Sequence, residues 1–510
     1  MNSNSRNLNA QELASFCRKK GFIYQSSEIY GGVSGVWDYG HIGTLLKKNF
    51  QHQWIKYFKS LHENFYEIQT GQIMHERVFK ASGHLENFYD PIVEIEGEDE
   101  TYRADHLIEE KTGEKAEDLS IDEMREVIIS KKLLGDIDYS KVSITNLNMM
   151  FDIHMGPKKG TKAYLRPETA QSPFVNFKIQ FELQRKKLPL GLLLIGSVFR
   201  NEISPRNLNL RTRELEQAEL QIFFNPNTLN EKHNKFDEIK DIQIPVKLVN
   251  STTNDEIEFV SVEQLLEYGI HEMYAYYLAI VYLFYRDVLH LDTNLRFLEL
   301  NEKERAFYNK MHFDIEMKMH STQKWVEIGG VHYRTNHDLS SHEKESKISM
   351  TIQDEARQEK VLPHVLELSF GVDRNMYSII DQTTYIHNEN NQTTMHMTSK
   401  LSPISVAILP LMNKDDLPII AREIFNELLE EDIVAVYDKS GSVGKRYARN
   451  DEIGTAYCIT IDYETIEEGE NKDTVTIRNR DTQEQKRVHK DKLVQVTRDL
   501  LKEKITFDEL

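Results

Sequence analysis

Cysteine is almost absent from this chain of 510 residues, which contains only Cys17 and Cys458. Two thiols so far apart in the sequence support neither a disulfide framework nor a thiolate zinc site, and they suit a reducing compartment. Long apolar runs are also missing, and the mean hydropathy is -0.55, so we expect no membrane-spanning segment. The opening residues lack the apolar stretch of a secretory signal. We therefore expect a cytoplasmic protein that binds no zinc.

Positive charge is in deficit as well, because 63 Lys and Arg residues face 82 Asp and Glu residues, a net charge of -19. This balance argues against indiscriminate binding to DNA or RNA through a globally positive field. The sequence also lacks a GxxxxGK[ST] phosphate loop and a strand-linked GxGxxG loop. What is present, 39% hydrophobic residues, is enough for sizeable cores. The composition is therefore compatible with an enzyme or with a binding protein, and the motifs have to decide between these two classes.

Hydrophobic spacing predicts the main elements. Apolar residues at helical intervals predict a long amphipathic helix over 40–61. Apolar or alternating runs predict strands over 191–200 and 215–224, joined as a hairpin by a long charged loop. Further strands are predicted over 324–334 and 364–370, and the second runs into a helix.

The second strand of the hairpin has two different faces. Ala218, Leu220, Ile222 and Phe224 share one face, whereas Gln217, Glu219 and Gln221 share the other. A polar face on a strand needs water or a ligand, so this strand is a candidate wall of a binding site.

Two segments differ from the rest in composition. Residues 94–126 are dense in acids, which predicts a solvated helical insertion. Residues 387–400 are polar and poor in large aliphatics, which predicts a linker. Beyond it, strand and helix patterns alternate and predict a separate α/β domain.

The charged hairpin loop interleaves arginines with carboxylates, namely Arg200, Arg206, Arg211 and Arg213 with Glu202, Glu214, Glu216 and Glu219. Guanidinium groups bind phosphate oxygens in pairs, and a carboxylate can accept a hydrogen bond from an amino group. The pattern therefore suits a polyphosphate ligand. Surface salt bridges explain the same pattern equally well.

Two shorter segments add to this picture. Residues 367–374 read as a strand that opens a helix, with Arg374 in its first turn, which favours either an anion site or an ordinary turn. In 164–177, Arg166 and Glu168 flank a proline before an apolar run, as at a capped helix N-terminus.

Together these segments resemble the class II aminoacyl-tRNA synthetases, in particular the dimeric type of glycyl-tRNA synthetase. SSEIYGGVSGVWDYG and the helix after it resemble motif 1 (about 27–61), FRNEISPRNLNLRTRELEQAE resembles motif 2 (about 198–224), and ELSFGVDR resembles motif 3 (about 364–382). Further text similar to that family is YRADHLIEE, YLRPETAQ, RTNHDLSSH and GSVGKRYARNDEIGTAYC. The resemblance covers most of the chain.

The resemblance implies an α+β catalytic domain over 1–390, in which helices flank an antiparallel sheet that carries insertions at about 81–160 and 226–320. A linker over 391–402 would lead to an α/β anticodon-binding domain over 403–510. It also implies a homodimer built partly on motif 1.

As for function, the resemblance implies a glycine–tRNA ligase that activates glycine with ATP and Mg²⁺ and transfers it to the 3′ end of tRNA(Gly). Arg200, Arg211 and Arg374 would be catalytic: Arg200 would hold the α-phosphate and the other two the outer phosphates. Glu202 would read the adenine amino group, and Glu327 would lie near Mg²⁺. The implied ATP-binding residues are Arg200, Asn201, Glu202, Leu210, Arg211, Thr212, Arg213, Glu214, Leu215, Glu327, Ile328, Gly371 and Arg374.

Glycine offers only an ammonium group and a small size for recognition. By resemblance, Glu168, Glu219 and Glu367 would surround the ammonium with help from Ser369. A cavity too small for alanine would exclude it sterically, because the difference of one methyl group by itself gives only weak discrimination between substrates. The implied glycine-binding residues are Arg103, Glu168, Leu215, Glu216, Gln217, Ala218, Glu219, Glu367 and Ser369.

In the C-terminal part, Lys445, Arg446 and Arg449 are the implied tRNA-binding residues, although basic residues in an acidic domain also occur as plain solvated faces. The chain departs from the family at Leu215, where an aromatic ring is usual, and at Leu368, where proline is usual. A synthetase-like protein that binds tRNA or regulates without catalysis is the alternative. Retention of the arginines and carboxylates named above favours the enzyme.

Overall fold

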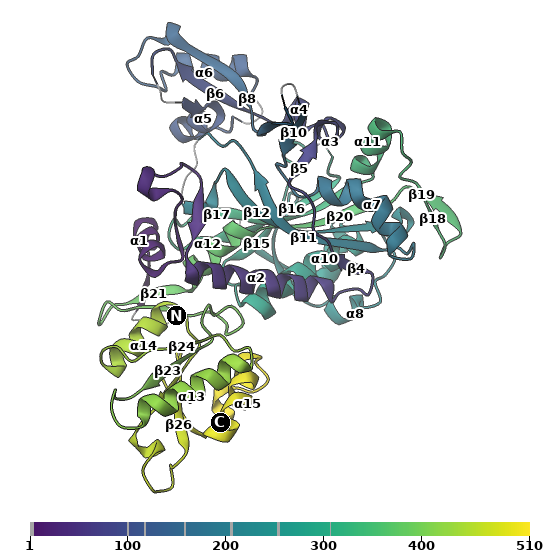
Figure 1. Ribbon diagram of the computed structural model, residues 1–510. Coiled ribbons are helices and arrows are strands. Elements are labelled where there is room, and N and C mark those ends of the chain that lie inside the picture. The colour runs from purple at the N-terminus through teal and green to yellow at the C-terminus, as the bar shows by residue number, and fades with distance from the viewer. Residues whose placement is uncertain are drawn as a thin grey trace.

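A computed structural model describes residues 5–98, 101–116, 119–157, 160–203, 208–251, 256–306 and 308–510. Arg206 of the charged loop lies outside these residues. Figure 1 shows a central body with a small lobe above it and a C-terminal domain below it.

A nine-stranded, mostly antiparallel sheet forms the centre of the body (Figure 1). Only the pairs β13·β15 and β4·β11 run parallel within it. In spatial order the strands are β14 (Glu258–Ser261), β13 (Gln243–Lys247), β15 (Leu295–Glu299), β16 (Met311–Lys318), β17 (Trp325–Thr335), β20 (His364–Gly371), β12 (Glu214–Phe224), β11 (Leu190–Phe199) and β4 (Phe65–Glu67). The predicted hairpin is β11 with β12, and both other predicted strands are confirmed as β17 and β20.

Helices bury one face of the sheet in the main hydrophobic core. The predicted amphipathic helix is α2 (His41–Lys59), which buries Leu46, Phe50, Trp54 and Phe58. These side chains share a core with the apolar face of β12, as the alternation predicted. The further helices that contribute to the same core include α1 (Ala10–Lys20), α10 (Glu272–Leu283) and α12 (Val372–Thr383).

The opposite face of the sheet is only partly covered. The helix α7 (Gln171–Leu183) packs its phenylalanines on Leu190, Leu192 and Phe223, beside α11 (His337–Ser346). Towards the ends of β12 and β20 this face stays polar. Shorter elements around the body are β2 (Ile23–Gln25), β3 (Trp37–Tyr39), β5 (Ile73–His75), α3 (Glu76–Ala81), α4 (His84–Asn87), β9 (Asp152–Met155), β10 (Thr161–Leu165), α8 (Phe236–Ile239), α9 (Val262–Glu267), β18 (Ile352–Asp354) and β19 (Glu359–Val361).

The acid-rich segment differs from the helical insertion expected over 94–126. The sheet order is β7 (Thr101–Arg103), β6 (Tyr89–Ile95) and β8 (Val142–Asn148), and α5 (Ala104–Thr112) and α6 (Ile121–Ser130) lie against it. Val93, Ile108 and Ile128 are buried in a core of their own. The prediction missed this core because acidic surface residues outnumber the few apolar ones in the sequence. The charge pattern reflects the surface of a small lobe that contains both strands and helices.

The segment 226–320 belongs to the body. It supplies β13 to β16 of the central sheet, and α10 is buried almost all round. No helix among the described residues is both long and apolar enough to cross a membrane.

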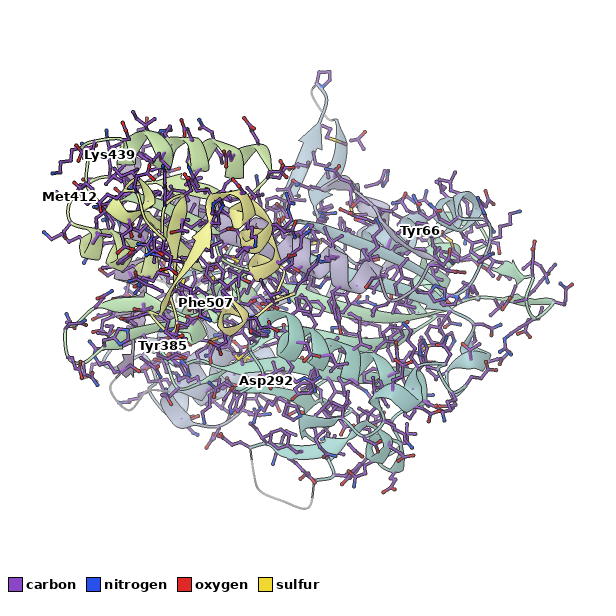
Figure 2. The ribbon with its side chains drawn as sticks, turned by 90° about the horizontal axis from the view of Figure 1, so that it is seen from below. Tyr66, Asp292, Tyr385, Met412, Lys439 and Phe507 are labelled. Atoms are coloured by element: carbon purple, nitrogen blue, oxygen red, sulfur yellow. The ribbon has the colours of Figure 1, made fainter. Side chains whose placement is uncertain are left out.

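The expected linker is ordered. β22 (Thr393–Met395) pairs with β21 (Thr384–His387), which also pairs with β1 (Ser5–Asn7) near the start of the chain. Met395, Met397 and Leu401 are buried in the main core, because the few apolar side chains of this polar stretch all point inward. Figure 2 shows Tyr385 of β21 beside the C-terminal domain, whose Met412 and Lys439 lie at its outer edge.

The C-terminal domain is α/β, as predicted. Its sheet has the order β24 (Ala435–Tyr437), β23 (Val406–Pro410), β25 (Tyr457–Ile461), β26 (Thr474–Asn479) and β27 (Gln485–His489). β24, β23 and β25 run parallel to one another, β26 is antiparallel to β25, and β27 is antiparallel to β26. The helices are α13 (Leu417–Glu430), α14 (Val443–Glu452) and α15 (Lys490–Leu501).

Candidate active site

A cleft opens where β12 begins and β20 passes into α12. It is lined by Arg200, Glu202, Asn209, Leu210, Arg211, Thr212, Leu215, Gly371, Asp373 and Arg374. Most of the residues predicted to bind ATP are therefore brought together. Leu215 supplies an apolar surface where the family resemblance led us to expect a ring.

Three guanidinium groups reach this cleft, two from the charged hairpin loop and one from α12. Arg200 donates to the carbonyl oxygen of Pro167 at 3.0 Å. Arg211 donates to Glu202 at 2.6 Å, and Nη1 of Arg374 donates to the carbonyl oxygen of Glu327 at 2.9 Å. Such a concentration of fixed positive charge suits a polyphosphate.

The other residues predicted to bind ATP lie around the cleft. Nη1 of Arg213 donates to the carbonyl oxygen of Ser34 at 3.0 Å, and the backbone N–H of Asn201 donates to Met149. Glu214 is exposed, Ile328 is buried in the core, and the carboxylate of Glu327 lies 3.0 Å from Arg374.

Asp373 joins the segments that resemble the three motifs. Its carboxylate accepts hydrogen bonds from Tyr39 at 2.5 Å and from the backbone N–H of Glu216 at 2.5 Å, and it lies 3.2 Å from the ammonium of Lys47. The hydroxyl of Tyr39 accepts from Asn209, which also donates to the carbonyl oxygen of Asp373 at 2.7 Å. One buried carboxylate thus fixes the cleft against α2.

The buried carboxylates of Glu219 and Glu367 lie further along the same face of the sheet, and Glu168, whose side chain is 13% exposed, lies before α7. Glu219 of β12 is opposite Ser369 of β20, whose hydroxyl donates to it at 3.3 Å. Gln221 donates to Glu219 at 3.2 Å and to Glu367 at 2.5 Å. Glu168 accepts from Gln171 at 2.9 Å. Three largely buried acids held close together suit a small cation such as an ammonium group.

The electrostatics of these acids differ. Burial and the neighbouring Glu367 raise the pKa of Glu219 to about 8, and burial also raises the pKa of Glu367 against the attraction of Arg334. Burial opposes the charge on Glu168 too, but His84 and Arg334 outweigh it and lower its pKa well below the ordinary value. The raised pKa favours a protonated Glu219 at neutral pH.

Arg334, which is not among the predicted site residues, is the cation that holds this group of acids. Arg334 of β17 is 2% exposed and donates to Asp338 at 2.8 and 3.0 Å and to Glu367 at 3.2 Å. Tyr308 covers its guanidinium at 4.2 Å. Both partners of the Arg334–Asp338 pair stand in RTNHDLSSH, where the spacing of four residues was the available signal.

Several predicted glycine-binding residues lie elsewhere. The side chains of Glu216 and Ala218 face α2, where Glu216 lies 2.9 Å from Lys47, because alternate residues of a strand point to opposite faces. Gln217 faces the acids and accepts from the backbone N–H of Thr169 at 3.1 Å. Arg103 belongs to the small lobe, where it pairs with Asp105 at 2.7 Å and with Asp90 at 3.2 Å.

The predicted tRNA-binding residues divide into two kinds. Lys445 and Arg449 are exposed on α14. Arg446 is 2% exposed and donates to the carbonyl oxygens of Pro410 and Leu411 at 2.6 and 3.1 Å. It therefore anchors α14 to the sheet of its own domain.

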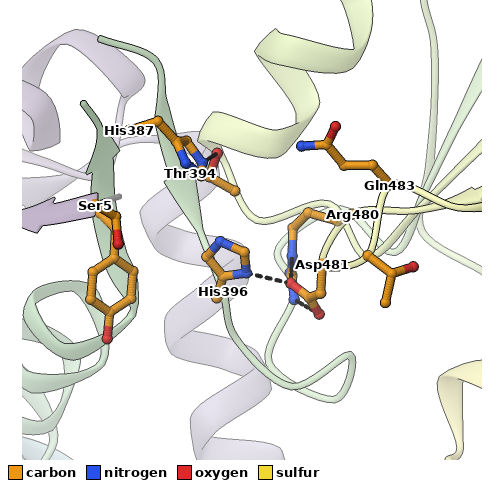
Figure 3. Close-up of a pocket in the computed structure, with 9 residues that line it drawn as sticks. Ser5, His387, Thr394, His396, Arg480, Asp481 and Gln483 are labelled. Carbon is orange, nitrogen blue, oxygen red and sulfur yellow. Dashed lines mark hydrogen bonds and ion pairs between the residues drawn. The ribbon is translucent and has the colours of Figure 1, made fainter. Parts of the chain in front are cut away.

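A separate cavity lies where the C-terminal domain meets the strands β21 and β22 (Figure 3). His396 and Asp481 are 2.7 Å apart in it, and His387 is 3.0 Å from Thr394. Figure 3 shows Arg480 beside Asp481, and the two form an ion pair at 2.7 Å. None of the residues predicted to bind ATP or glycine lines this cavity, so we read it as part of the junction between domains.

Comparison with known proteins agrees with this geometry. Residues 157–383 match the family model described as the tRNA synthetase class II core domain (G, H, P, S and T), and residues 405–500 match the model described as the anticodon binding domain. The glycine–tRNA ligase of Pyrococcus furiosus is 36% identical over 93% of this chain and 96% of its own length. That of Methanothrix thermoacetophila is 35% identical over 98% of each chain.

A prolyl-tRNA synthetase from Cryptosporidium parvum, solved with L-proline and AMP, has a similar fold. The TM-score is 0.57 at 13% identity, over 97% of this chain and 75% of that one. This likeness concerns the fold alone. The near full-length similarity to the archaeal enzymes goes further, and with it the chain belongs to the glycine–tRNA ligase family of class II aminoacyl-tRNA synthetases.

Proposed function

We propose that this protein joins glycine to tRNA(Gly) in two steps, first forming glycyl-adenylate from glycine and ATP and then transferring the glycyl group to the 3′-terminal adenosine. The observation that carries the proposal is the juxtaposition of two sites on one strand. Leu215 lines the arginine cleft, and Glu219, four residues further along the same face of β12, stands among the acids. A strand advances about 3.4 Å per residue, so the two sites are about 14 Å apart at most.

The chemistry follows from this arrangement. Glu168, Glu219 and Glu367 would hold the ammonium of glycine and leave its carboxylate to face the cleft. Arg200, Arg211 and Arg374 would hold the phosphates, so that the carboxylate oxygen attacks the α-phosphorus and pyrophosphate leaves. The protein supplies positioning and fixed charge, and the arginines stabilise the negative charge that grows in the transition state.

Glu327 would supply a ligand to Mg²⁺ brought in with ATP. Its carboxylate side chain is 53% exposed and beside Arg374, which offers a hard oxygen donor where the phosphates would lie. The described residues contain no group of three acids, histidines or cysteines that could enclose an ion by themselves. When bound, the ion would neutralise phosphate charge.

Exposed residues support two partners. Lys445 and Arg449 on α14 would contact the tRNA backbone. A second copy of the chain would cover the loop before α2, where the neighbouring Ile29, Tyr30 and Val33 are 88%, 87% and 43% exposed, because apolar side chains exposed close together suit an interface. We place the reaction in the cytoplasm, where translation uses charged tRNA.

The test is ATP–pyrophosphate exchange by the full chain with glycine, alanine or serine, with and without Mg²⁺, followed by charging of tRNA(Gly). Exchange that needs both glycine and Mg²⁺ is expected. A folded protein without exchange for any amino acid would refute the catalytic function and favour a synthetase-like tRNA-binding protein. Light scattering with and without substitution of Ile29 and Tyr30 by Ser tests the dimer.

A further inference from the structure

Two rows of side chains cross the polar face of the sheet, and the proposed function uses only one end of them. The pairing of β12, β20, β17 and β16 aligns Glu219, Ser369, Gly330 and Asp314 in the first row. It aligns Gln221, Glu367, His332 and His312 in the second. The two histidines adjoin the acids and have no role so far.

His332 leans towards the first row. A Cβ atom built on Gly330 would lie 2.6 Å from Nε2 of His332, so the imidazole occupies the space that any side chain at position 330 would fill. Gly330 is the direct neighbour of Ser369 across the strands. The ring therefore forms a wall next to the serine that lies among the acids.

The same nitrogen faces Glu367, since Nε2 of His332 is 3.5 Å from Oε1 of that carboxylate. On the other side of the ring, the amide nitrogen of Asn309 lies 3.2 Å from Nδ1. An amide nitrogen only donates, so Nδ1 accepts and a neutral ring carries its proton on Nε2. Burial and the neighbouring His312 and Arg334 keep the pKa of His332 well below its ordinary value, which agrees with a neutral ring.

His312 supports this orientation from behind. The two ring centroids are 4.1 Å apart, and the Asn309 amide also lies 3.4 Å from Nδ1 of His312. His312 in turn lies 2.9 Å from Asp314. The imidazole of His332 is thus held on three sides, with 15% of its side chain exposed.

We propose that His332 positions Glu367 through its Nε2–H and limits the size of the amino acid, because its ring fills the volume over Gly330 into which a larger substrate would extend. This inference rests on the proposed function, since it takes the acids to be the ammonium site. A shape limit adds discrimination that the loss of a single methyl contact cannot provide.

The test compares the wild type with His332→Ala, His332→Gln and the control His364→Ala in exchange driven by glycine or by alanine. His364 is half-buried on the same strand as Glu367, but it contacts Tyr333 at 2.7 Å. For His332→Ala we expect the KM for glycine to rise about tenfold with little change in kcat, and the alanine-to-glycine ratio of kcat/KM to rise at least tenfold. His332→Gln, which keeps an N–H donor, should recover most of the glycine KM, and the control should match the wild type.

A wild-type KM and an unchanged alanine ratio in His332→Ala would overturn this inference alone. A wild type without glycine-dependent exchange would instead refute the proposed function. Melting temperatures identify a misfolded variant, and if His332→Ala does not fold, the shorter donor in His332→Asn provides the same test, with a higher KM and a higher alanine ratio expected.

Discussion

Arg334 and Asp338 form a two-pronged ion pair, with both partners almost fully buried and 2.8 and 3.0 Å between their atoms. The remaining nitrogen of the guanidinium donates to Glu367 at 3.2 Å. A single cation therefore joins β17, α11 and β20 directly beneath the proposed ammonium site.

Replacing this cation should destabilise the fold. Arg334→Met would leave Asp338 and Glu367 buried without a counter-charge, and breaking such a pair costs about 3–5 kcal/mol. Urea unfolding should report this loss in the free energy of unfolding. The control is Arg18→Met, because Arg18 is exposed and pairs with Glu28 on the surface, where the effect should stay below about 1 kcal/mol. Equal effects of the two substitutions would contradict the assignment.

Glycine binding should depend on pH through Glu219. Its pKa is raised to about 8, so an ammonium ligand must displace a proton from it below that pH. The KM for glycine is therefore expected to fall as the pH rises from 6.5 to 8.5, by up to about tenfold per unit below the pKa. The same raised pKa makes the folded state lose stability as the pH rises from about 4.3 to 8.

Glu219→Gln is the matched variant for this pH profile. It removes the titrating carboxylate and keeps the size of the side chain, so its KM should be higher and nearly independent of pH over the same range. An unchanged slope in this variant would assign the titration to another group.

Arg374→Ala should reduce glycine-dependent exchange by at least a hundredfold, because the guanidinium is a fixed charge aimed at the cleft. Its side chain is 30% exposed, so the melting temperature should change by only a few degrees. Arg286→Ala, which removes an exposed arginine paired with Asp287, is the control. Full activity of Arg374→Ala would exclude this residue from the site.

The exposed and buried basic residues of α14 should behave differently. Lys445→Ala should weaken tRNA binding and reduce the slope of log Kd against log salt by about one. Arg446→Ala should instead lower the melting temperature, because three backbone carbonyl oxygens lose their donor. Lys472→Ala, at an exposed Lys472–Glu468 pair, serves as control; an equal loss of binding there would remove α14 from the interface.

The sequence predicted best where periodicity and local chemistry agree. The two faces of β12 followed directly from alternation, and the arginine cleft from motif-like text. The same alternation also shows why Glu216 does not face the acids: as an even-numbered residue of the strand, it lies with Ala218 on the face towards α2. The prediction grouped five consecutive residues as a site, whereas a strand offers only every second side chain to one ligand.

Contacts between residues that are distant in the sequence could not be predicted from it. Arg334 meets Glu367 across 33 residues, and His332 meets His312 only through the register of β16 and β17. Nothing local marks Arg446 as buried and Arg449 as exposed, because that difference arises from where α14 docks on β23. Similarly, the two methionines of 391–402 hold this segment in place only because they are buried in the main core, which the sequence around them does not indicate.

The strand β21 helps to hold the connection between the body and the C-terminal domain in place. It is bonded on one side to β1, near the start of the chain, and on the other to β22, which leads into the C-terminal domain. The chain therefore leaves the body from a paired strand, and just after it the carbonyl oxygen of Met397 accepts a hydrogen bond from Arg480 of the C-terminal domain at 2.6 Å, which restricts the motion of α14 relative to the cleft. If a tRNA binds at both the cleft and α14, as proposed, its shape has to match the distance between them, and shape would then contribute to selection alongside any contact to its bases.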